Sequence, residues 1–354
     1  MVVVRAPQGS SLLSKVRARL RWLRLSYVVS ARLLKKGGVD VLQSRDDWMA
    51  GLVALLLAKR HRLPFVFQYS FPFAQWRKVL YRQLHGVWGG LAAEFEARMF
   101  HFVMRRVDLL LPISDKMAAD LRRENVNPPM RVTPLAANVE RAASEADGMR
   151  IRSALGLEEA QVVLYVGTMA QERGLELLVR AFATVADRIP EARLLMVGDG
   201  GARADLCYLA STLGVREAVV FTGEVPYDDV PAYIASCDVA VSPVPPLDIY
   251  TLSSPIKLFE YMAAGKAVVA NQEILEHKNV LESSNAGLLT PFAADGFATA
   301  VCALLDDRSS RQKMGDRGRQ WVQEKRSFAS LASMLVEEYE KLIACGTAAQ
   351  VRSE

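Results

Sequence analysis

The sequence predicts an α/β protein with two Rossmann-like domains that face each other across a cleft. Short β-branched strands alternate with helices along the chain, which is typical of parallel sheets covered by helices on both faces. The alternation pauses at a polar stretch near residue 150 and then starts again, and 354 residues suffice for two domains. Because ligands of open parallel sheets bind at the carboxyl ends of the strands, we expect a site in the cleft.

The predicted elements follow in order. In the first half we expect strands at 2–5, 39–43, 64–69, 108–113 and 131–135, with helices over 14–36, 47–60 and 74–106 and from Asp115. In the second half we expect strands at 162–166, 193–197, 219–222, 238–242 and 267–270, with intervening helices that include 174–188. A polar linker between Glu140 and Leu157 separates the halves. We therefore divide the chain into a domain at 1–145, a domain at 146–326 and a terminal helix at 327–345.

Positive charge is concentrated in the first half. Residues 1–150 hold 25 Lys and Arg against 12 Asp and Glu, a net charge of +13, whereas the remainder carries −8. The segment from Ser14 to Lys36 has eight basic residues and no acidic one, interleaved with apolar side chains. This pattern is typical of a basic helix on an anionic membrane surface, and equally of a solvated helix packed on a sheet. We find no recognised nucleic-acid-binding module and expect no nucleic-acid partner.

Cysteine, histidine and hydropathy patterns argue against several classes of protein. Cys207, Cys237, Cys302 and Cys345 are far apart and form no CxxC pair, which fits a reducing cytoplasm. The four histidines are scattered and predict no metal cluster. No uncharged apolar run reaches the ~18 to 20 residues of a membrane span. We therefore expect a cytoplasmic protein, either free or peripheral at the inner face of the membrane, without a metal or cofactor.

The turns after two strands of the second half have glycines suited to ligand binding or tight turns. Gly167 follows the strand at 162–166 and lets a ligand approach the backbone, and Arg173 begins the next helix within reach of that ligand. The glycines at 198–201 predict a tight turn only, because Arg203 stands where a G-x-G-x-x-G dinucleotide fingerprint needs its third glycine.

The turn after the strand at 219–222 is a further candidate. Val225 and Pro226 can offer backbone groups to a flat nucleobase. Asp228 or Asp229 is expected to cap the helix that follows.

The stretch SSPIKLFEYMAAGKAVVAN, from Ser253 to Asn271, predicts an anion site. Ser254 is a good N-cap and Pro255 a good first helical residue, so the free amides of the first turn face an anion. Lys257 adds a positive charge, and Glu260 lies one turn on along the same face. A carboxylate beside a phosphate is explained if it accepts both hydroxyls of a ribose, so the pattern indicates a nucleotide diphosphate. A surface salt bridge between Lys257 and Glu260, worth ~0.3 to 0.5 kcal/mol, is the alternative interpretation.

Several segments occur together in a characteristic order. They are YVGTMAQERGLELLVRAF, LLMVGDGG, VVFTGEVPYDDVPAYIASCDVAVSP and SSPIKLFEYMAAGKAVVA, preceded by VDVLQSRDDWMAGLVALLLAKRHRLPFVF and LLLPISDKMAADL. On the basis of these segments, residues 108–343 resemble a family 4 glycosyltransferase of the GT-B fold. The first half is similar to the acceptor domain of that family. The resemblance implies a retaining, metal-independent transferase that moves a sugar from a UDP- or GDP-sugar to a glycan or lipid-linked acceptor. It also implies that the helix at 327–345 packs back toward the acceptor domain.

The resemblance assigns roles to individual residues. The phosphate-binding Arg/Lys pair of the family falls on Thr168 and Arg173, and Lys257, as in the subgroup with SPxKLFEYMA, replaces part of the missing charge. Of the two glutamates spaced E-x7-E, the second is Glu260 and the first falls on Leu252. We therefore expect Arg173, Lys257 and Glu260 to be catalytic. The residues expected to bind the donor are Gly167, Thr168, Val225, Ser253, Ser254, Pro255 and Ile256.

The chain also departs from the family pattern. The first β-α-β portion of the acceptor domain has no counterpart, so we expect a truncated amino-terminal domain, and Tyr69, Ser70 and Phe71 stand where the family often has a histidine. These departures leave open a second interpretation, a nucleotide-sugar-binding or scaffold protein without turnover. A nicotinamide-dependent enzyme acting on sugar nucleotides is a third, which the missing G-x-G-x-x-G disfavours.

Overall fold

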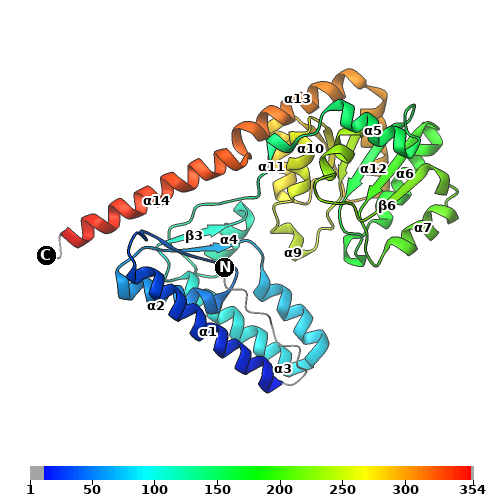
Figure 1. The fold of residues 1–354 in the computed structure, drawn as a ribbon. Coiled ribbons are helices and arrows are strands. Elements are labelled where there is room, and N and C mark those ends of the chain that lie inside the picture. Colours follow the sequence, from blue (N-terminus) through cyan, green and yellow to red (C-terminus); the bar gives the residue numbers. More distant parts are fainter. Residues whose placement is uncertain (1–11, 352–354) are drawn as a thin grey trace. The chain divides into compact units, whose positions relative to one another are not determined.

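The computed structural model describes the backbone of residues 12–351, and their side chains except those of 12–16, 73–88 and 346–351. The described residues form two compact units (Figure 1): unit 1 comprises residues up to 133 and those from 334 onward, and unit 2 is the continuous segment 134–333. Both units are built on parallel sheets, which confirms the predicted class of two Rossmann-like domains. The strand expected at 2–5 lies outside the described residues. Within the part of the chain described, no helix has the length and apolar character needed to cross a bilayer.

Unit 1 contains a three-stranded parallel sheet with the strand order β1-β2-β3. Its elements are α1 (Leu12–Lys35), β1 (Leu42–Arg45), α2 (Trp48–His61), β2 (Phe65–Tyr69), α3 (Phe73–Met104), β3 (Leu109–Pro112), α4 (Asp115–Arg123) and most of α14 (Phe328–Val351). The prediction of a strand at 131–135 is wrong. Only an isolated bridge forms beside it, between Leu110 and Met130. The amides of Arg131 and Thr133 donate to carbonyls of β3, but the next amide on that side, of Leu135, donates to the hydroxyl of Ser254 instead.

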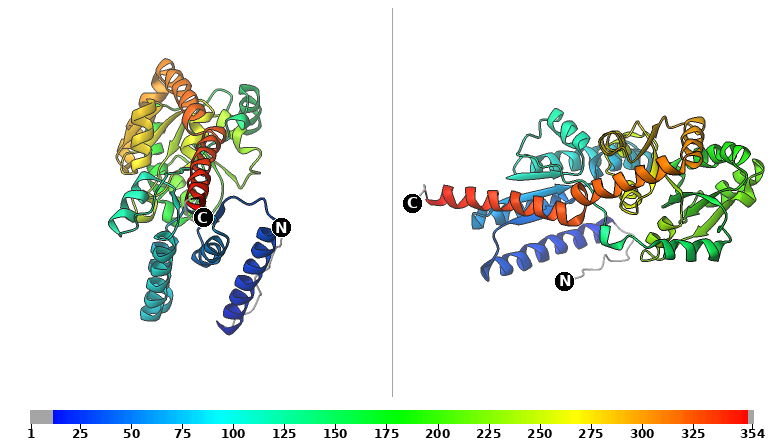
Figure 2. Two further views of the ribbon diagram at one scale, coloured as in Figure 1. Left: turned by 90° about the vertical axis from the view of Figure 1, so that its left-hand side faces the viewer. Right: turned by 90° about the horizontal axis from the view of Figure 1, so that it is seen from above.

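Helices cover both faces of the unit 1 sheet. On one face, Val66, Leu109 and Leu111 pack against the side chains that α14 contributes, which are Leu335, Tyr339 and Leu342. On the other face, the ring centres of Phe67 and of Phe100 on α3 lie 6.5 Å apart. Helix α1 packs on α2, as the views in Figure 2 also show.

Unit 2 contains a six-stranded parallel sheet with the order β6-β5-β4-β7-β8-β9. Its strands are β4 (Gln161–Val166), β5 (Ala192–Val197), β6 (Val219–Gly223), β7 (Val239–Ser242), β8 (Ala267–Asn271) and β9 (Gly287–Thr290), and the last of these is absent from the sequence prediction. Its helices are η1 (Val139–Arg141), α5 (Glu145–Leu155), η2 (Gln171–Arg173), α6 (Glu176–Arg188), α7 (Arg203–Thr212), η3 (Arg216–Ala218), α8 (Val230–Ala235), α9 (Asp248–Thr251), α10 (Ile256–Ala263), α11 (Leu275–Ser284), α12 (Ala294–Asp306) and α13 (Arg308–Lys325).

Alternate residues of the unit 2 strands enter two different cores. Val163 and Tyr165 of β4 belong to a core with α6, α7 and α12, whereas Val162 and Leu164 belong to a core with α8, α10, α11 and α13. Successive side chains of a strand point to opposite faces, so a strand buried on both faces reads as a continuous apolar run. One face of the sheet packs against α10 in this second core. Helix α10 contains two of the predicted site residues, Lys257 and Glu260.

The polar segment 134–144 is part of unit 2. The amide of Ala137 donates to the carbonyl of Arg326 over 2.9 Å, and the side chain of Ala137 is buried in the core shared with α10. The boundary placed by composition at residue 145 falls at the first residue of α5, beyond this anchored segment.

Candidate functional site

The strand order of unit 2 reverses between β4 and β7. The chain adds β5 and β6 on one side of β4 and then β7, β8 and β9 on the other. Such a reversal leaves a crevice at the carboxyl ends of the two central strands, because their connections run in opposite directions. Gly167 follows β4 at this edge of the sheet, so the first predicted binding residue lies at the switch point.

The ammonium of Lys257 lies against Gly167. Gly167 has a φ of 146°, and a Cβ atom added to it would stand only 2.5 Å from the Nζ atom of Lys257. Only glycine combines this backbone conformation with room for the lysine side chain. The structure therefore brings these two predicted residues together, although 90 positions separate them in the sequence.

Tyr165 holds Lys257 at this edge. The Lys257 ammonium donates to the hydroxyl of Tyr165 over 3.3 Å and lies 4.7 Å from the ring centre. The same hydroxyl donates to the carbonyl of Thr168 over 3.1 Å. Burial raises the pKa of Tyr165 to about 12, so the phenol stays neutral. Tyr165 is not among the predicted site residues, and its signal in the sequence is a single tyrosine in the otherwise aliphatic strand VVLYV.

Burial lowers the pKa of Lys257 to about 7. This value of about 7 already includes the positive charge of Arg173, which also lowers the pKa of Lys257, and the negative charge of Glu260, which raises it. Within unit 2, which the structure describes in full, no ion pair joins Lys257 to Glu260, so the interpretation as a surface salt bridge is wrong. An anion bound beside Lys257 would offset the repulsion from Arg173 and keep the ammonium charged.

The sequence pattern predicts that Arg173 begins the following helix, but Arg173 is the last residue of η2. Helix α6 starts three residues later, at Glu176, because Gly174 adopts a left-handed conformation. The guanidinium of Arg173 lies 4.8 Å from the ring centre of Tyr250 on α9. Its charge acts on both Lys257 and Tyr165, which places the two predicted cations in one electrostatic environment.

The start of α10 differs by one residue from the prediction. Pro255 is the N-cap, without a side-chain capping bond, and Ile256 is the first helical residue. The hydroxyl of Ser254 accepts from the amide of Leu135 over 3.2 Å and donates to Glu276 over 3.3 Å, so it is not available to cap the helix. The Ser253 hydroxyl donates to the carbonyl of Tyr250 over 2.6 Å. Ile256 is exposed.

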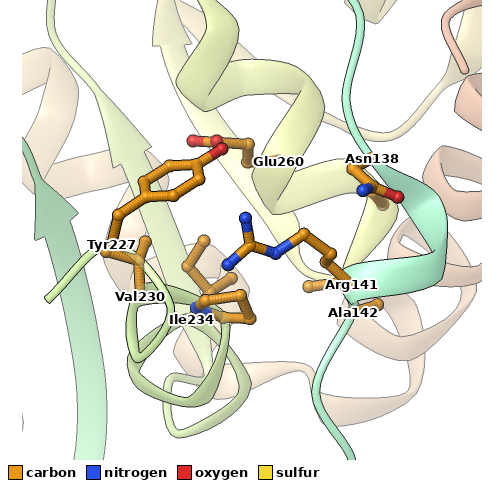
Figure 3. Close-up of a pocket in the computed structure, with 10 residues that line it drawn as sticks. Asn138, Arg141, Ala142, Tyr227, Val230, Ile234 and Glu260 are labelled. Carbon is orange, nitrogen blue, oxygen red and sulfur yellow. The ribbon is translucent and has the colours of Figure 1, made fainter. Parts of the chain in front are cut away.

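Glu260 lies one turn beyond Lys257, at the wall of a small pocket (Figure 3). Burial raises the pKa of its carboxyl, and the positive charges of Lys257 and Arg141 lower it. The pocket has a volume of about 40 Å³, which is room for about one water molecule. A desolvated carboxylate at this position can accept hydrogen bonds from two neighbouring hydroxyls.

Arg141 lines the same pocket. Its guanidinium lies 4.6 Å from the ring centre of Tyr227 and forms an ion pair with Asp228, and Figure 3 shows it extending toward the side of Tyr227 and Glu260. Neither Arg141 nor Tyr227 is among the predicted site residues. Arg141 belongs to the polar linker, where composition gives no sign that the chain folds back onto the sheet.

The remaining predicted residues line the turns around this region. Thr168 is exposed, and its carbonyl is held by Tyr165. Val225 is half-buried against the core that contains α10. Asp229 is the N-cap of α8 but makes no side-chain capping bond, and Asp228 pairs with Arg141 instead, so neither carboxylate caps the helix as predicted. Among the described residues, no cluster of His, Cys, Asp and Glu is suited to hold a metal ion.

Two family models match the chain. Residues 149–321 match the model of glycosyl transferases group 1, and residues 1–136 match a glycosyl transferase 4-like domain. The chain is 27% identical over 243 residues to alpha-D-kanosaminyltransferase of Streptomyces kanamyceticus, which covers 68% of this chain and 62% of that protein. It is 31% identical over 209 residues to a GDP-mannose-dependent alpha-(1-6)-phosphatidylinositol monomannoside mannosyltransferase of Mycolicibacterium smegmatis, covering 58% of this chain and 54% of that protein. The matched regions thus span less than two thirds of these relatives.

Solved structures of the GT-B type share the fold. Sucrose-phosphate synthase of Thermosynechococcus elongatus superposes with a TM-score of 0.73 at 22% identity, covering 96% of this chain and 82% of that one. HepE of Anabaena, in complex with UDP and glucose, superposes with a TM-score of 0.70 at 16% identity, covering 95% and 84%. The family matches along both halves and this shared fold lead to one conclusion: the chain belongs to the glycosyl transferases group 1, with a GT-B fold.

Proposed function

We propose that the chain is a retaining, metal-independent glycosyltransferase that moves a sugar from a UDP- or GDP-sugar to a glycan or lipid-linked acceptor. The observation that carries this proposal is the desolvated Lys257 ammonium against Gly167, with Glu260 one helical turn away. A positive site followed by a buried carboxylate matches a diphosphate followed by a ribose. HepE binds UDP and glucose, and the mycobacterial relative is named for GDP-mannose, which supports a nucleotide sugar as the donor.

The donor would lie along α10. Its diphosphate contacts Lys257, Arg173 and the amides at the start of the helix, since a helix N-terminus favours anions. Glu260 accepts the ribose hydroxyls, and the base lies beyond it, near Val225. Gly167 leaves room for the Lys257 side chain beside the diphosphate, and Thr168 and the turn from Ser253 to Ile256 border the diphosphate.

In the transfer step the bond between the anomeric carbon and the diphosphate oxygen breaks, and the acceptor oxygen bonds to the same face of the sugar. The acceptor proton passes to the departing diphosphate. Lys257 and Arg173 stabilise the negative charge that develops on this leaving group, and they act strongly because the site is partly desolvated. The chain's own cations thus supply the charge stabilisation for which other transferases use a metal.

A thermal-shift titration of the full chain with UDP, GDP and ADP and their sugar conjugates tests the donor site. A ligand at 100 times its dissociation constant stabilises the folded state by about 2.7 kcal/mol. We expect one base series to raise Tm, and Glu260→Ala to abolish the rise. Absence of any shift for a folded protein would contradict the proposal. Equal turnover with and without EDTA tests metal independence.

A donor-binding or scaffold protein without turnover is the second candidate. It is favoured by Leu252, which is buried where the family has its first glutamate, and by Thr168, where the family has an arginine. Nucleotide-sugar binding without transfer or hydrolysis would support this candidate over the enzyme.

We further propose that α1 brings the protein to an anionic membrane that holds the acceptor. Arg17, Arg21, Arg24, Arg32 and Lys35 recur at helical spacing, so they share one stripe of α1, and all are exposed. Leu20, which is 60% exposed and lies beside this stripe, can enter the interface. The relative named for a phosphatidylinositol mannoside supports a lipid-linked acceptor, and the free cysteines support a location on the cytoplasmic face.

Flotation with vesicles tests this partner. The full chain should float with vesicles that contain anionic phospholipid and not with neutral ones. Replacing Arg17, Arg21 and Arg24 by Gln should abolish flotation. A matched control removes the same charge elsewhere in unit 1, by Arg98→Gln, Arg122→Gln and Arg123→Gln, and should still float. Equal loss in both variants would refute a specific role for α1.

A further inference from the structure

A buried ion pair lies close to the start of α10. Glu276, in the first turn of α11, is 5% exposed, and its Oε1 atom accepts a hydrogen bond from Nη2 of Arg326 over 2.9 Å. Arg326 follows the last residue of α13. Each charge is at the helix end whose dipole favours it. Because a buried charge that loses its partner is costly, the pair is expected to stay together.

The Glu276–Arg326 pair holds α10 at two points. The Glu276 carboxylate accepts from the hydroxyl of Ser254, directly before the helix, over 3.3 Å. The Arg326 guanidinium lies 5.3 Å from the ring centre of Phe259, in the middle of the helix. Ser254 and Phe259 are both buried, so neither has room to shift by itself. The position of the helix that carries both proposed donor contacts therefore depends on this pair.

The same groups hold the segments through which the chain enters and leaves unit 2. The amide of Leu135 donates to the Ser254 hydroxyl over 3.2 Å. The amide of Ala137 donates to the carbonyl of Arg326 over 2.9 Å, and a parallel bridge joins Ala137 to Ser327. The segment at 134–138 is therefore bonded to both Ser254 and Arg326, and the segment at 326–333 begins with Arg326 itself.

We propose that Glu276 and Arg326 are positioning residues that couple the start of α10 to the segments 134–138 and 326–333. The inference rests on the proposed donor site. A diphosphate bound at the first turn of α10 restrains the turn that contains Ser254. This restraint stabilises the hydrogen bonds of the Ser254 hydroxyl to Leu135 and Glu276. By linkage, segments that are already ordered favour donor binding to the same extent.

Hydrogen exchange of the full chain, with and without UDP, GDP or ADP, measures this coupling. In the unmodified protein the nucleotide that raises Tm should slow exchange in 256–263, and also in 134–138 and 326–333. Ser254→Ala should keep the first effect and lose the other two. Its nucleotide affinity should fall by about threefold to tenfold, the usual worth of one hydrogen bond.

Glu276→Gln separates the two arms of the coupling. The amide oxygen of Gln can still accept from Ser254, but the charge that faces Arg326 is gone. Nucleotide-induced protection should therefore persist at the amide of Leu135, which donates to Ser254, and disappear in 326–333 and at the amide of Ala137, which donates to Arg326. This variant also gives an answer if Ser254→Ala folds poorly.

Asp238→Asn is the control for general loss of stability. Asp238 is a partly buried carboxylate of unit 2 that pairs with Arg152 at 2.6 Å and with Arg311 at 3.3 Å, just before the start of β7. Its replacement should lower Tm and leave the nucleotide-induced protection unchanged in all three segments. Loss of protection in this variant as well would reduce the role of Glu276 to stability alone and overturn the proposal.

The outcomes distinguish the proposal from the donor site on which it rests. If no nucleotide slows exchange in 256–263, the donor site is refuted and the coupling with it. If 256–263 is protected while 134–138 and 326–333 are unchanged, or if Ser254→Ala keeps all three effects, the donor site stands and the coupling is refuted.

Discussion

The ammonium nitrogen of Lys257 stands 3.3 Å from the hydroxyl oxygen of Tyr165, at the edge of the unit 2 sheet where β4 ends. Tyr165 keeps its proton at neutral pH, so this contact compensates only part of the lost hydration of the cation. The positive charge of Lys257 therefore stays available for an anion. Its desolvation lowers the stability of the folded protein, which a lysine with a purely structural role would not do.

Lys257→Met should therefore separate stability from activity. Removing a desolvated cation should leave Tm unchanged or raise it, whereas kcat/KM should fall by about 10² to 10³ because a contact to the leaving group is lost. Lys266→Met is the matched control, since its ammonium donates to the carbonyls of Ala235 and Cys237. That variant should lower Tm and spare turnover. A large drop in Tm for Lys257→Met with normal turnover would contradict the assignment.

Nucleotide binding should take up protons above pH 7. Between about pH 7 and the ordinary lysine pKa of 10.5, the unfolded chain carries a proton on Lys257 that the free folded protein lacks, so this group makes stability rise with pH in that window. A bound diphosphate raises the pKa of Lys257, so binding at pH 8 should consume up to about one proton and weaken as pH rises. Calorimetry in buffers of different ionisation enthalpy measures this uptake. Uptake that persists in Lys257→Met would point to another group.

The ribose assignment of Glu260 predicts an effect that depends on the ligand. For the nucleotide that binds, the 2′-deoxy form should bind the unmodified protein about 10- to 150-fold more weakly, since hydrogen bonds to charged groups contribute about 1.5 to 3 kcal/mol. In Glu260→Ala the two forms should bind alike. Dissociation constants for the four combinations form a thermodynamic cycle. A deoxy penalty of the same size in both proteins would place the ribose elsewhere.

Gly167→Ala should abolish donor binding. Its Cβ would take the space of the Lys257 ammonium, at a φ that side chains rarely adopt. Gly156→Ala is the control, because Gly156 also has a positive φ, 66°, but no atom lies within 4 Å of the added carbon. Both variants should lose about 1 kcal/mol or more of stability from the backbone term. Only Gly167→Ala should lose the nucleotide-induced rise in Tm.

The shared position of Gly167, Arg173 and Lys257 could be predicted because it follows from local patterns. Gly167 comes directly after β4, Arg173 lies in the connection from β4 to α6, and Lys257 is in the first turn of α10. Parallel strands place their carboxyl ends, and the connections that follow them, at one edge of the sheet. The continuous apolar run VVLYV predicts β4, and similar short apolar runs predict the strands beside it. β9 is missing from the prediction because GLLT is short and begins with glycine, which weakens a strand signal.

Other features of the site depend on contacts between distant segments. Arg141 reaches the pocket only because the segment after residue 134 is anchored at Ala137, and nothing near Arg141 in the sequence indicates this. Ser254 is a favourable capping residue by type, but it does not cap α10 because its hydroxyl bonds to Leu135 and Glu276 instead. Preferences of residue type describe what a side chain does when no stronger partner is nearby.

The division of the chain into units has a consequence for recombination between relatives. Unit 2 is one uninterrupted segment, so a gene fragment for residues 134–333 carries the whole of it. Unit 1 is split, because Leu335, Tyr339 and Leu342 on α14 cover the face of its sheet formed by Val66, Leu109 and Leu111. Exchanging the proposed donor site between relatives therefore takes a single cassette with two splice points. A unit 1 transplanted without its own α14 would meet a foreign helix on that apolar face and need compensating substitutions there.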